Sequence, residues 1–204
     1  MTTRRPVVLT ELRAATRGEH HALDHHPELN RLVRSDLTWT GYARSLAAMH
    51  LPHGALERAV RRSAVCLGTE AVLAPARLWR LEKDLQALGV RAPDTGTEAG
   101  GPLADTVPAL IGLRYVLEGS RLGAEVLARC VRRALGPDAP MSFLQAPDTP
   151  LHWQQFSSQA AVACMDHAAV QQAVAAARQA FGNYLAALDA MAMRTASSGS
   201  AAYR

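Results

Sequence analysis

The sequence predicts a single all-α domain. Apolar residues recur every three or four positions through most of the chain, which is the spacing of one helix face, and the strict alternation typical of half-buried strands is absent. The chain has 204 residues, 49% of them hydrophobic, which is enough to bury one sizeable core. It has no run of about 18 apolar residues, so no membrane-spanning helix is expected.

Six segments carry the helical pattern, with glycine- and proline-rich stretches between several of them. The second segment contains Pro52, where we expect a kink. The helices are expected over residues 8–24, 40–64, 70–88, 103–135, 150–164 and 167–193. We expect one domain over residues 9–193, between a flexible start over residues 1–8 and a disordered tail over residues 194–204.

The composition narrows the classes of partner. The net charge is +4, but the arginines are spread along the chain and aromatic residues make up only 5%, so a nucleic-acid surface is not indicated. An excess of arginine suits an acidic electron-transfer partner. The cysteines Cys66, Cys130 and Cys164 stand outside any CxxC pattern, and the chain start lacks an apolar signal core, so we expect a cytoplasmic protein with reduced thiols.

The first helix carries a histidine on its apolar stripe. The stripe consists of Leu9, Leu12, Thr16, His20 and Leu23. His21 is rotated about 100° away from it. The pattern alone fits a core histidine or a metal ligand.

A lone histidine is more often a core residue, but two other features of this helix would suit a metal ligand. Asp24 lies one turn after His20, where its carboxylate can accept a hydrogen bond from the ring nitrogen that does not bind metal. Arg13 and Arg17 lie two turns and one turn before it, where they could meet carboxylates of a ligand.

The fourth segment contains two glycines, Gly119 and Gly123, one turn apart and therefore on one face. A glycine inside a helix costs roughly 1 kcal/mol relative to alanine, so something is expected to lie against the bare backbone there. That neighbour could be another helix or a flat ligand. The segment is one long helix or two joined at the glycines, and Arg121 is expected to point away into solvent.

The remaining candidate residues form weaker patterns. His50, His53 and Glu57 share one side of a helix and could be half of a metal site. A di-iron site needs several carboxylates and paired Glu-x-x-His motifs, which the chain lacks.

Residues Leu12 to Asp24 read Leu-x-x-Ala-Thr-x-x-x-His-x-x-Leu-Asp, and residues Tyr115 to Gly123 read Tyr-Val-x-Glu-Gly-Ser-x-Leu-Gly. In these two motifs the chain resembles the bacterial biliverdin-producing heme oxygenases, especially the branch that often accompanies bacteriophytochromes. The resemblance spans roughly residues 9 to 190, in order. It implies a compact all-α heme oxygenase fold in which heme lies between a proximal helix and a kinked distal helix.

The resemblance also implies roles for individual residues. His20 would be the axial ligand of the heme iron, Asp24 its hydrogen-bond partner, and Gly119, Ser120 and Gly123 would lie on the opposite, distal face of the heme. Heme would be both substrate and cofactor, cleaved with dioxygen to biliverdin, carbon monoxide and ferrous iron.

This chain departs from the wider family in two places. Many members outside the branch carry an acidic residue where Ser120 stands, so Ser120 would have to act through water. Some relatives hold the heme propionates with basic residues on the helix that begins near Trp153, where this chain has none. Arg13, Arg17, Arg129 or Arg132 would serve instead.

Electrons would come from a separate protein, because the chain has no flavin or nicotinamide fingerprint and too few cysteines for an iron–sulfur cluster. A ferredoxin with its reductase is the expected donor, and a bacteriophytochrome is a candidate acceptor of biliverdin. Two other functions stay open: a non-catalytic heme carrier or sensor on the same fold, and another enzyme on a related helical fold, such as a thiamine-salvage or di-iron protein.

Overall fold

The computed structural model describes residues 6–93 and 103–201, and within this part of the chain every regular element is a helix. The all-α fold predicted from the sequence is therefore confirmed. The elements are α1 (Val7–Ala15), α2 (Arg17–Asp24), α3 (Pro27–Asn30), the 3₁₀ turn η1 (Arg31–Val33), α4 (Trp39–Cys66), η2 (Glu70–Val72), α5 (Leu78–Ala87), α6 (Val107–Leu135), α7 (Thr149–Ala163) and α8 (His167–Ala201).

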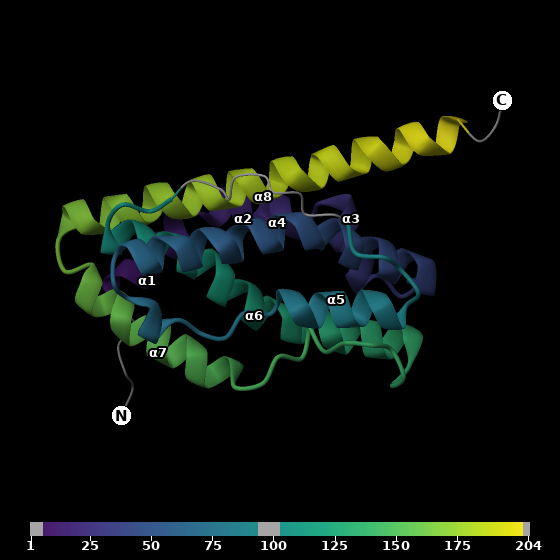
Figure 1. Cartoon of the computed structure of the whole chain (residues 1–204), viewed down its shortest axis with the longest axis horizontal. Coiled ribbons are helices and arrows are strands. Elements are labelled where there is room, and N and C mark those ends of the chain that lie inside the picture. Colours follow the sequence, from purple (N-terminus) through teal and green to yellow (C-terminus); the bar gives the residue numbers. More distant parts are fainter. Residues whose placement is uncertain (1–5, 94–102, 202–204) are drawn as a thin grey trace.

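Helix α8 is the longest element and organises the others. It runs along one side of the molecule, and its C-terminal end extends beyond the remaining helices (Figure 1). It packs most extensively on α6 and also contacts α1, α2 and α4. The helix that contains His20 (α2) and the helix that contains the paired glycines (α6) therefore both pack on α8.

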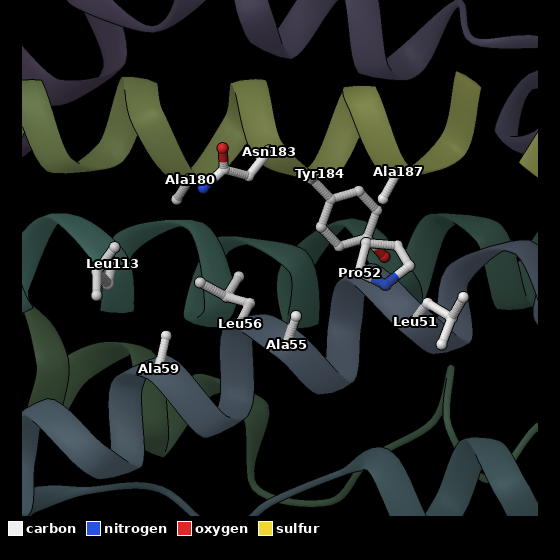
Figure 2. Close-up of a pocket in the computed structure, with 10 residues that line it drawn as sticks. All are labelled: Leu51, Pro52, Ala55, Leu56, Ala59, Leu113, Ala180, Asn183, Tyr184 and Ala187. Atoms are coloured by element: carbon white, nitrogen blue, oxygen red, sulfur yellow. The ribbon is translucent and has the colours of Figure 1, made fainter. Parts of the chain in front are cut away.

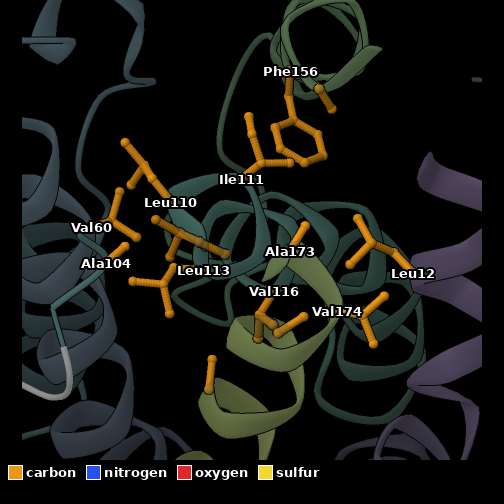
Figure 3. Close-up of a cluster of buried hydrophobic side chains, with 14 of the residues drawn as sticks. Leu12, Val60, Ala104, Leu110, Ile111, Leu113, Val116, Phe156, Ala173 and Val174 are labelled. Carbon is orange, nitrogen blue, oxygen red and sulfur yellow. The ribbon is translucent and has the colours of Figure 1, made fainter. Parts of the chain in front are cut away.

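The main apolar core lies where α1, α4, α6, α7 and α8 meet. Figure 3 shows Phe156 of α7 beside Ile111 of α6, and Leu12 of α1 facing Val174 of α8. Leu12 and Phe156 are fully buried. These contacts follow directly from the helical spacing of the apolar residues, since each helix turns its apolar stripe inward.

Several helix boundaries differ from those expected, each for a local reason. The expected first helix is divided at Thr16, whose hydroxyl and backbone N–H both donate to the Leu12 carbonyl, at 2.7 Å and 3.0 Å. The expected helix over residues 70–88 becomes η2 and α5, joined by an extended segment with Pro75, which cannot continue a helix. The helix expected from residue 103 begins at Val107, after a Thr106 side chain that accepts a hydrogen bond from the Ala109 N–H.

The ends of the expected domain also differ. α1 begins at Val7, and Val8 is buried in the core although it belongs to the start expected to be flexible. α8 continues to Ala201 rather than ending at residue 193, where the disordered tail was expected to begin. Residues 1–5, 94–102 and 202–204 lie outside the described part.

Gly112 sets the distance between α6 and α8. A Cβ atom at this position would lie 2.1 Å from the Ala173 carbonyl oxygen and 2.9 Å from the Ala177 nitrogen. Both are backbone atoms, which have little room to move. The glycine that permits close helix packing is therefore Gly112, in the turns of α6 that precede the sequence motif.

We expect Gly112→Ala to destabilise the protein by about 1–3 kcal/mol, because the added methyl group forces the two helices apart. Gly119→Ala is the matched control, since a Cβ there meets nothing within 4 Å. It should stabilise the ligand-free protein by up to about 1 kcal/mol through helix propensity. Urea unfolding curves measure both, and a Gly112→Ala protein as stable as wild type would contradict the close contact.

Candidate functional site

His20 is presented to solvent on α2 with one ring nitrogen held. Its side chain is 56% exposed, and its Nδ1 lies 3.0 Å from the Asp24 carboxylate. A carboxylate accepts hydrogen bonds, so this contact places the ring proton on Nδ1 and leaves a lone pair on Nε2. The ring also lies against Phe181 of α8, with centroids 5.9 Å apart. The result is an imidazole that Asp24 and Phe181 orient, with Nε2 as the ring nitrogen that can coordinate a metal.

Its neighbour His21 has a different environment. The His21 ring stacks on His25 with centroids 4.0 Å apart. The two histidine rings therefore have different neighbours, and the assignment of His20 rather than His21 as the metal ligand stays a prediction.

Arg178 of α8 fixes the junction between α1 and α2. Its Nε donates to the Ala15 carbonyl at 3.0 Å and lies 3.1 Å from the Glu19 carboxylate. The bond to Ala15 spans 163 positions in sequence, so no local pattern could have singled out this residue. It ties the start of the His20 helix to α8.

Gly119 and Gly123 face open space. A Cβ atom at either position would meet nothing within 4 Å, so these glycines do not serve helix packing as Gly112 does. The same side of α6 carries Leu122 and Val126, whose side chains are 36% and 49% exposed. This stretch of α6 is an apolar, partly bare surface without a protein neighbour at the glycines, and a flat apolar ligand would cover it.

Ser120 lies at the edge of this surface and is already engaged in two hydrogen bonds. Its hydroxyl donates to the Leu117 carbonyl at 2.7 Å and accepts a hydrogen bond from Nη2 of Arg77. Because the hydroxyl has a single proton, Ser120 in this arrangement acts only as an acceptor toward Arg77. Arg77, which the sequence reading missed, lies just before α5.

The backbone at Arg77 is held by Glu57 of α4. The Glu57 carboxylate accepts the N–H of Arg77 at 2.6 Å and that of Leu78 at 3.2 Å, which caps the start of α5. It also lies 3.1 Å from Nε2 of His53. Burial alone would raise the pKa of Glu57, but these hydrogen bonds outweigh it and hold the pKa at about 2.

The charge states of this pair follow from burial. His53 is almost completely buried, which lowers its pKa, so it is neutral at pH 7. Glu57 is therefore an ionised carboxylate that faces a neutral imidazole and the N-terminus of a helix.

Two arginines of α6 bind the same connecting segment from the other side. Arg121 donates to the Pro75 carbonyl at 2.5 Å and pairs with Glu118 at 2.9 Å, and Arg114 donates to the Val72 carbonyl at 3.1 Å. The expectation that Arg121 is solvated is wrong: it is 3% exposed, because the segment with Pro75 covers it. Burial and the nearby Arg121 charge lower the pKa of Arg77 to about 10, which still leaves it charged at neutral pH.

The four arginines expected to meet ligand carboxylates are all exposed. Arg13 lies on α1 and Arg17 at the start of α2, within two turns of His20. Arg129 and Arg132 lie in the last turns of α6, beyond Gly123. Their role toward a ligand stays a prediction.

Other parts of the molecule fit a cofactor less well. A small groove between α4 and α8, lined by Pro52, Leu56 and Tyr184 among others, encloses about 100 Å³, which is too small for a porphyrin (Figure 2). A larger cleft of about 620 Å³ beside Thr106 and Gln172 contains none of the expected site residues.

The histidines of α4 do not gather into a metal site. His50 lies 3.1 Å from Glu82, whereas His53 contacts Glu57. In the described ranges, no group of three or more His, Cys, Asp or Glu residues is arranged to hold a metal ion.

The sequence matches the family model described as heme oxygenase over residues 7–190. The chain belongs to the heme oxygenase family. A heme oxygenase from Leptospira interrogans superposes with a TM-score of 0.69 at 21% identity, covering 89% of this chain and 98% of the other. One from Neisseria meningitidis gives 0.67 at 22% identity, with 90% and 91% covered, and heme oxygenase-1 from Synechocystis sp. PCC6803 gives 0.64 at 15%, with the same coverage.

At these identities the solved structures establish the shared fold, and the family model establishes the membership. A sequence comparison with curated proteins finds no significant match. None of the described helices of this heme oxygenase has the length and apolar character needed to cross a membrane.

The residues present fit heme. His20 offers a free imidazole nitrogen on a helix that packs on α8. Gly119 and Gly123 offer a bare, apolar surface on α6, which packs on the same helix. An iron porphyrin needs one coordinating atom and flat apolar surfaces, and the chain supplies both.

The Glu57 cap makes a pH-dependent contribution to stability. The folded pKa of Glu57 lies below the ordinary 4.5, so its contribution is complete above pH 4.5 and is lost as the pH falls toward 2. We expect Glu57→Gln to cost about 2 kcal/mol at pH 7, because a neutral amide caps the helix more weakly.

Unfolding curves between pH 7 and pH 2 measure this cost, which should shrink as wild-type Glu57 is protonated. Glu125→Gln on the exposed side of α6 is the control and should behave as wild type at every pH. A cost for Glu57→Gln that stays constant across this range would show that the carboxylate charge does not matter.

Proposed function

We propose that this heme oxygenase cleaves heme with dioxygen and external electrons to biliverdin, carbon monoxide and ferrous iron, using His20 as the axial ligand and the glycine surface of α6 as the opposite face. The observation that carries the proposal is the open space at Gly119 and Gly123, since the same helix uses Gly112 for packing and leaves these two uncovered. Heme supplies the redox chemistry when bound.

The chain's own residues bind and orient. Asp24 holds the His20 ring by Nδ1 and fixes its orientation. The bare backbone of α6 at Gly119 and Gly123 leaves room for a small ligand such as dioxygen on that side of the heme. Arg13, Arg17, Arg129 and Arg132 are the basic side chains proposed to meet the heme carboxylates.

One experiment tests this function against a non-catalytic heme carrier or sensor. The purified protein is titrated with heme while the Soret band is recorded, and ascorbate is then added in air. An oxygenase loses the Soret band and gives the spectrum of biliverdin, whereas a carrier keeps a reduced heme spectrum. A protein that binds no heme would exclude both and favour another enzyme on a related helical fold.

We expect His20→Ala to abolish the axial ligation of ferric heme and His21→Ala to preserve it. The reason is that the Asp24 bond frees Nε2 of His20, while the His21 ring is stacked on His25. Electron paramagnetic resonance of the ferric complex reports the ligand, and added imidazole should restore the native signal in His20→Ala. Loss of the native signal in His21→Ala but not in His20→Ala would show that His21, and not His20, is the ligand.

Gly123→Leu should bind heme but yield less than a tenth of the wild-type biliverdin, because a bulky side chain fills the space for dioxygen. The yield is read from the absorbance of the product after complete reduction. Glu125→Leu adds a leucine on an exposed position of the same helix and should leave the yield unchanged. A normal yield from Gly123→Leu would mean that heme does not approach this surface.

The electron donor is proposed to be an acidic ferredoxin with its reductase, because the chain has a net charge of +4. The ferredoxin-driven rate should fall as salt rises, since exposed charges are screened over roughly 10 Å at 0.1 M ionic strength. The ascorbate-driven rate in the same buffers is the control. Equal salt dependence of the two rates would argue against electrostatic docking. A bacteriophytochrome as acceptor of biliverdin, which the sequence motifs imply, is part of the same proposal.

A further inference from the structure

Arg77 is a buried cation directly behind Ser120. Its side chain is 1% exposed, and its guanidinium lies over the Phe143 ring at 4.7 Å. Nη2 donates to the Ser120 hydroxyl, but Nε and Nη1 are buried and have no hydrogen-bond partner among the residues that the structure describes. A buried guanidinium with two unpartnered donor atoms is costly, so its retention next to the candidate site calls for a function.

The charge of Arg77 is not neutralised by a contact ion pair. Glu57 accepts the backbone N–H of Arg77 rather than its guanidinium, and Glu118 pairs with Arg121. His53 is neutral, and Tyr184, which also interacts electrostatically with Arg77, stays protonated because burial raises its pKa. Glu57 and Glu118 interact with the Arg77 charge at longer range, but within the described residues no carboxylate forms a salt bridge with its side chain, which donates to the Ser120 hydroxyl.

Ser120 connects this charge to the open surface. It lies about 60° around the helix from Gly123, and it is an exposed residue. Because its proton is used by the Leu117 carbonyl, the hydroxyl itself offers no donor to a ligand. Any electrostatic preference of the surface beside the glycines therefore comes from the guanidinium behind it.

We propose that Arg77 is a positioning residue that acts through Ser120 and makes the surface beside Gly119 and Gly123 electropositive, so that it favours an anionic ligand over a neutral ligand of similar size. The inference rests on the proposed placement of heme against that surface. A small anion at the open side of the iron is stabilised by a fixed positive charge in a dry environment, where screening is weak.

The test compares two small probes in the heme-loaded protein. Azide is the anionic probe, titrated into the ferric complex, and carbon monoxide is the neutral probe, titrated into the ferrous complex. Arg77→Gln removes the positive charge. Ser120→Asp leaves Arg77 in place but puts a carboxylate beside its guanidinium, at an exposed position.

Both variants should weaken azide binding about tenfold or more and change carbon monoxide binding less than about twofold, because only the anionic probe interacts with a charge at this position. Arg62→Gln makes the same charge change on an exposed position of α4 and should leave both affinities unchanged. Circular dichroism and the Soret spectrum check that each variant is folded and loaded. If Arg77→Gln does not fold, Ser120→Asp alone decides.

Wild-type azide affinity in Ser120→Asp would overturn the inference, and so would equal weakening of both probes, which indicates structural damage rather than charge. The outcome is separable from that of the proposed function. A protein that binds heme through His20 and yields biliverdin, but shows no selective azide effect, refutes only the role of Arg77. A protein that binds no heme refutes both.

Discussion

The backbone contact between α6 and α8 at Gly112 is the constraint on which the rest of the site depends. With a Cβ atom only 2.1 Å from the Ala173 carbonyl, any other residue would push the two helices apart. Since α8 also carries Phe181 against His20 and Arg178 against the α1–α2 junction, the same displacement would move the candidate ligand. Gly112 thus fixes the position of the His20 helix relative to the glycine surface of α6, although it is part of neither.

A second constraint is the polar interior between α4, α5 and α6. Arg114 and Arg121 of α6 bind carbonyls of the segment before α5, and Arg77 of that segment binds Ser120 of α6. The bonds run in both directions, so the segment and the helix are fixed to each other where α6 passes the glycines. Burying three arginines with only Glu57 and Glu118 nearby costs stability, and such groups are better explained by specificity or function than by stability.

The sequence predicted the parts of this structure that depend on short-range spacing. The helical class, the His20–Asp24 contact and the separation of His20 from His21 all follow from the 3.6-residue repeat. Gly119 and Gly123 do lie inside a helix, as expected, but what covers them stays a prediction. The sequence could not distinguish them from Gly112, because only the packing of α8 shows that Gly112 is the glycine in contact with another helix backbone.

The residues missed in the sequence share one property. Arg77 and Arg178 act on elements that lie far from them in sequence, and arginine is usually a surface residue, so the general expectation for Arg121 was solvation. Arg121 is buried because the non-helical segment with Pro75 passes over α6 at this point and its carbonyl accepts a hydrogen bond from Arg121. Local patterns cannot reveal such long-range cover.

The crystal structure of the heme complex tests the central claim most directly. The account predicts that Nε2 of His20 coordinates the iron on one side, and that the backbone of Gly119 and Gly123 lies in van der Waals contact, about 3.5–4 Å, with the opposite side. Heme coordinated by His21, or bound away from the glycine surface of α6, would contradict it.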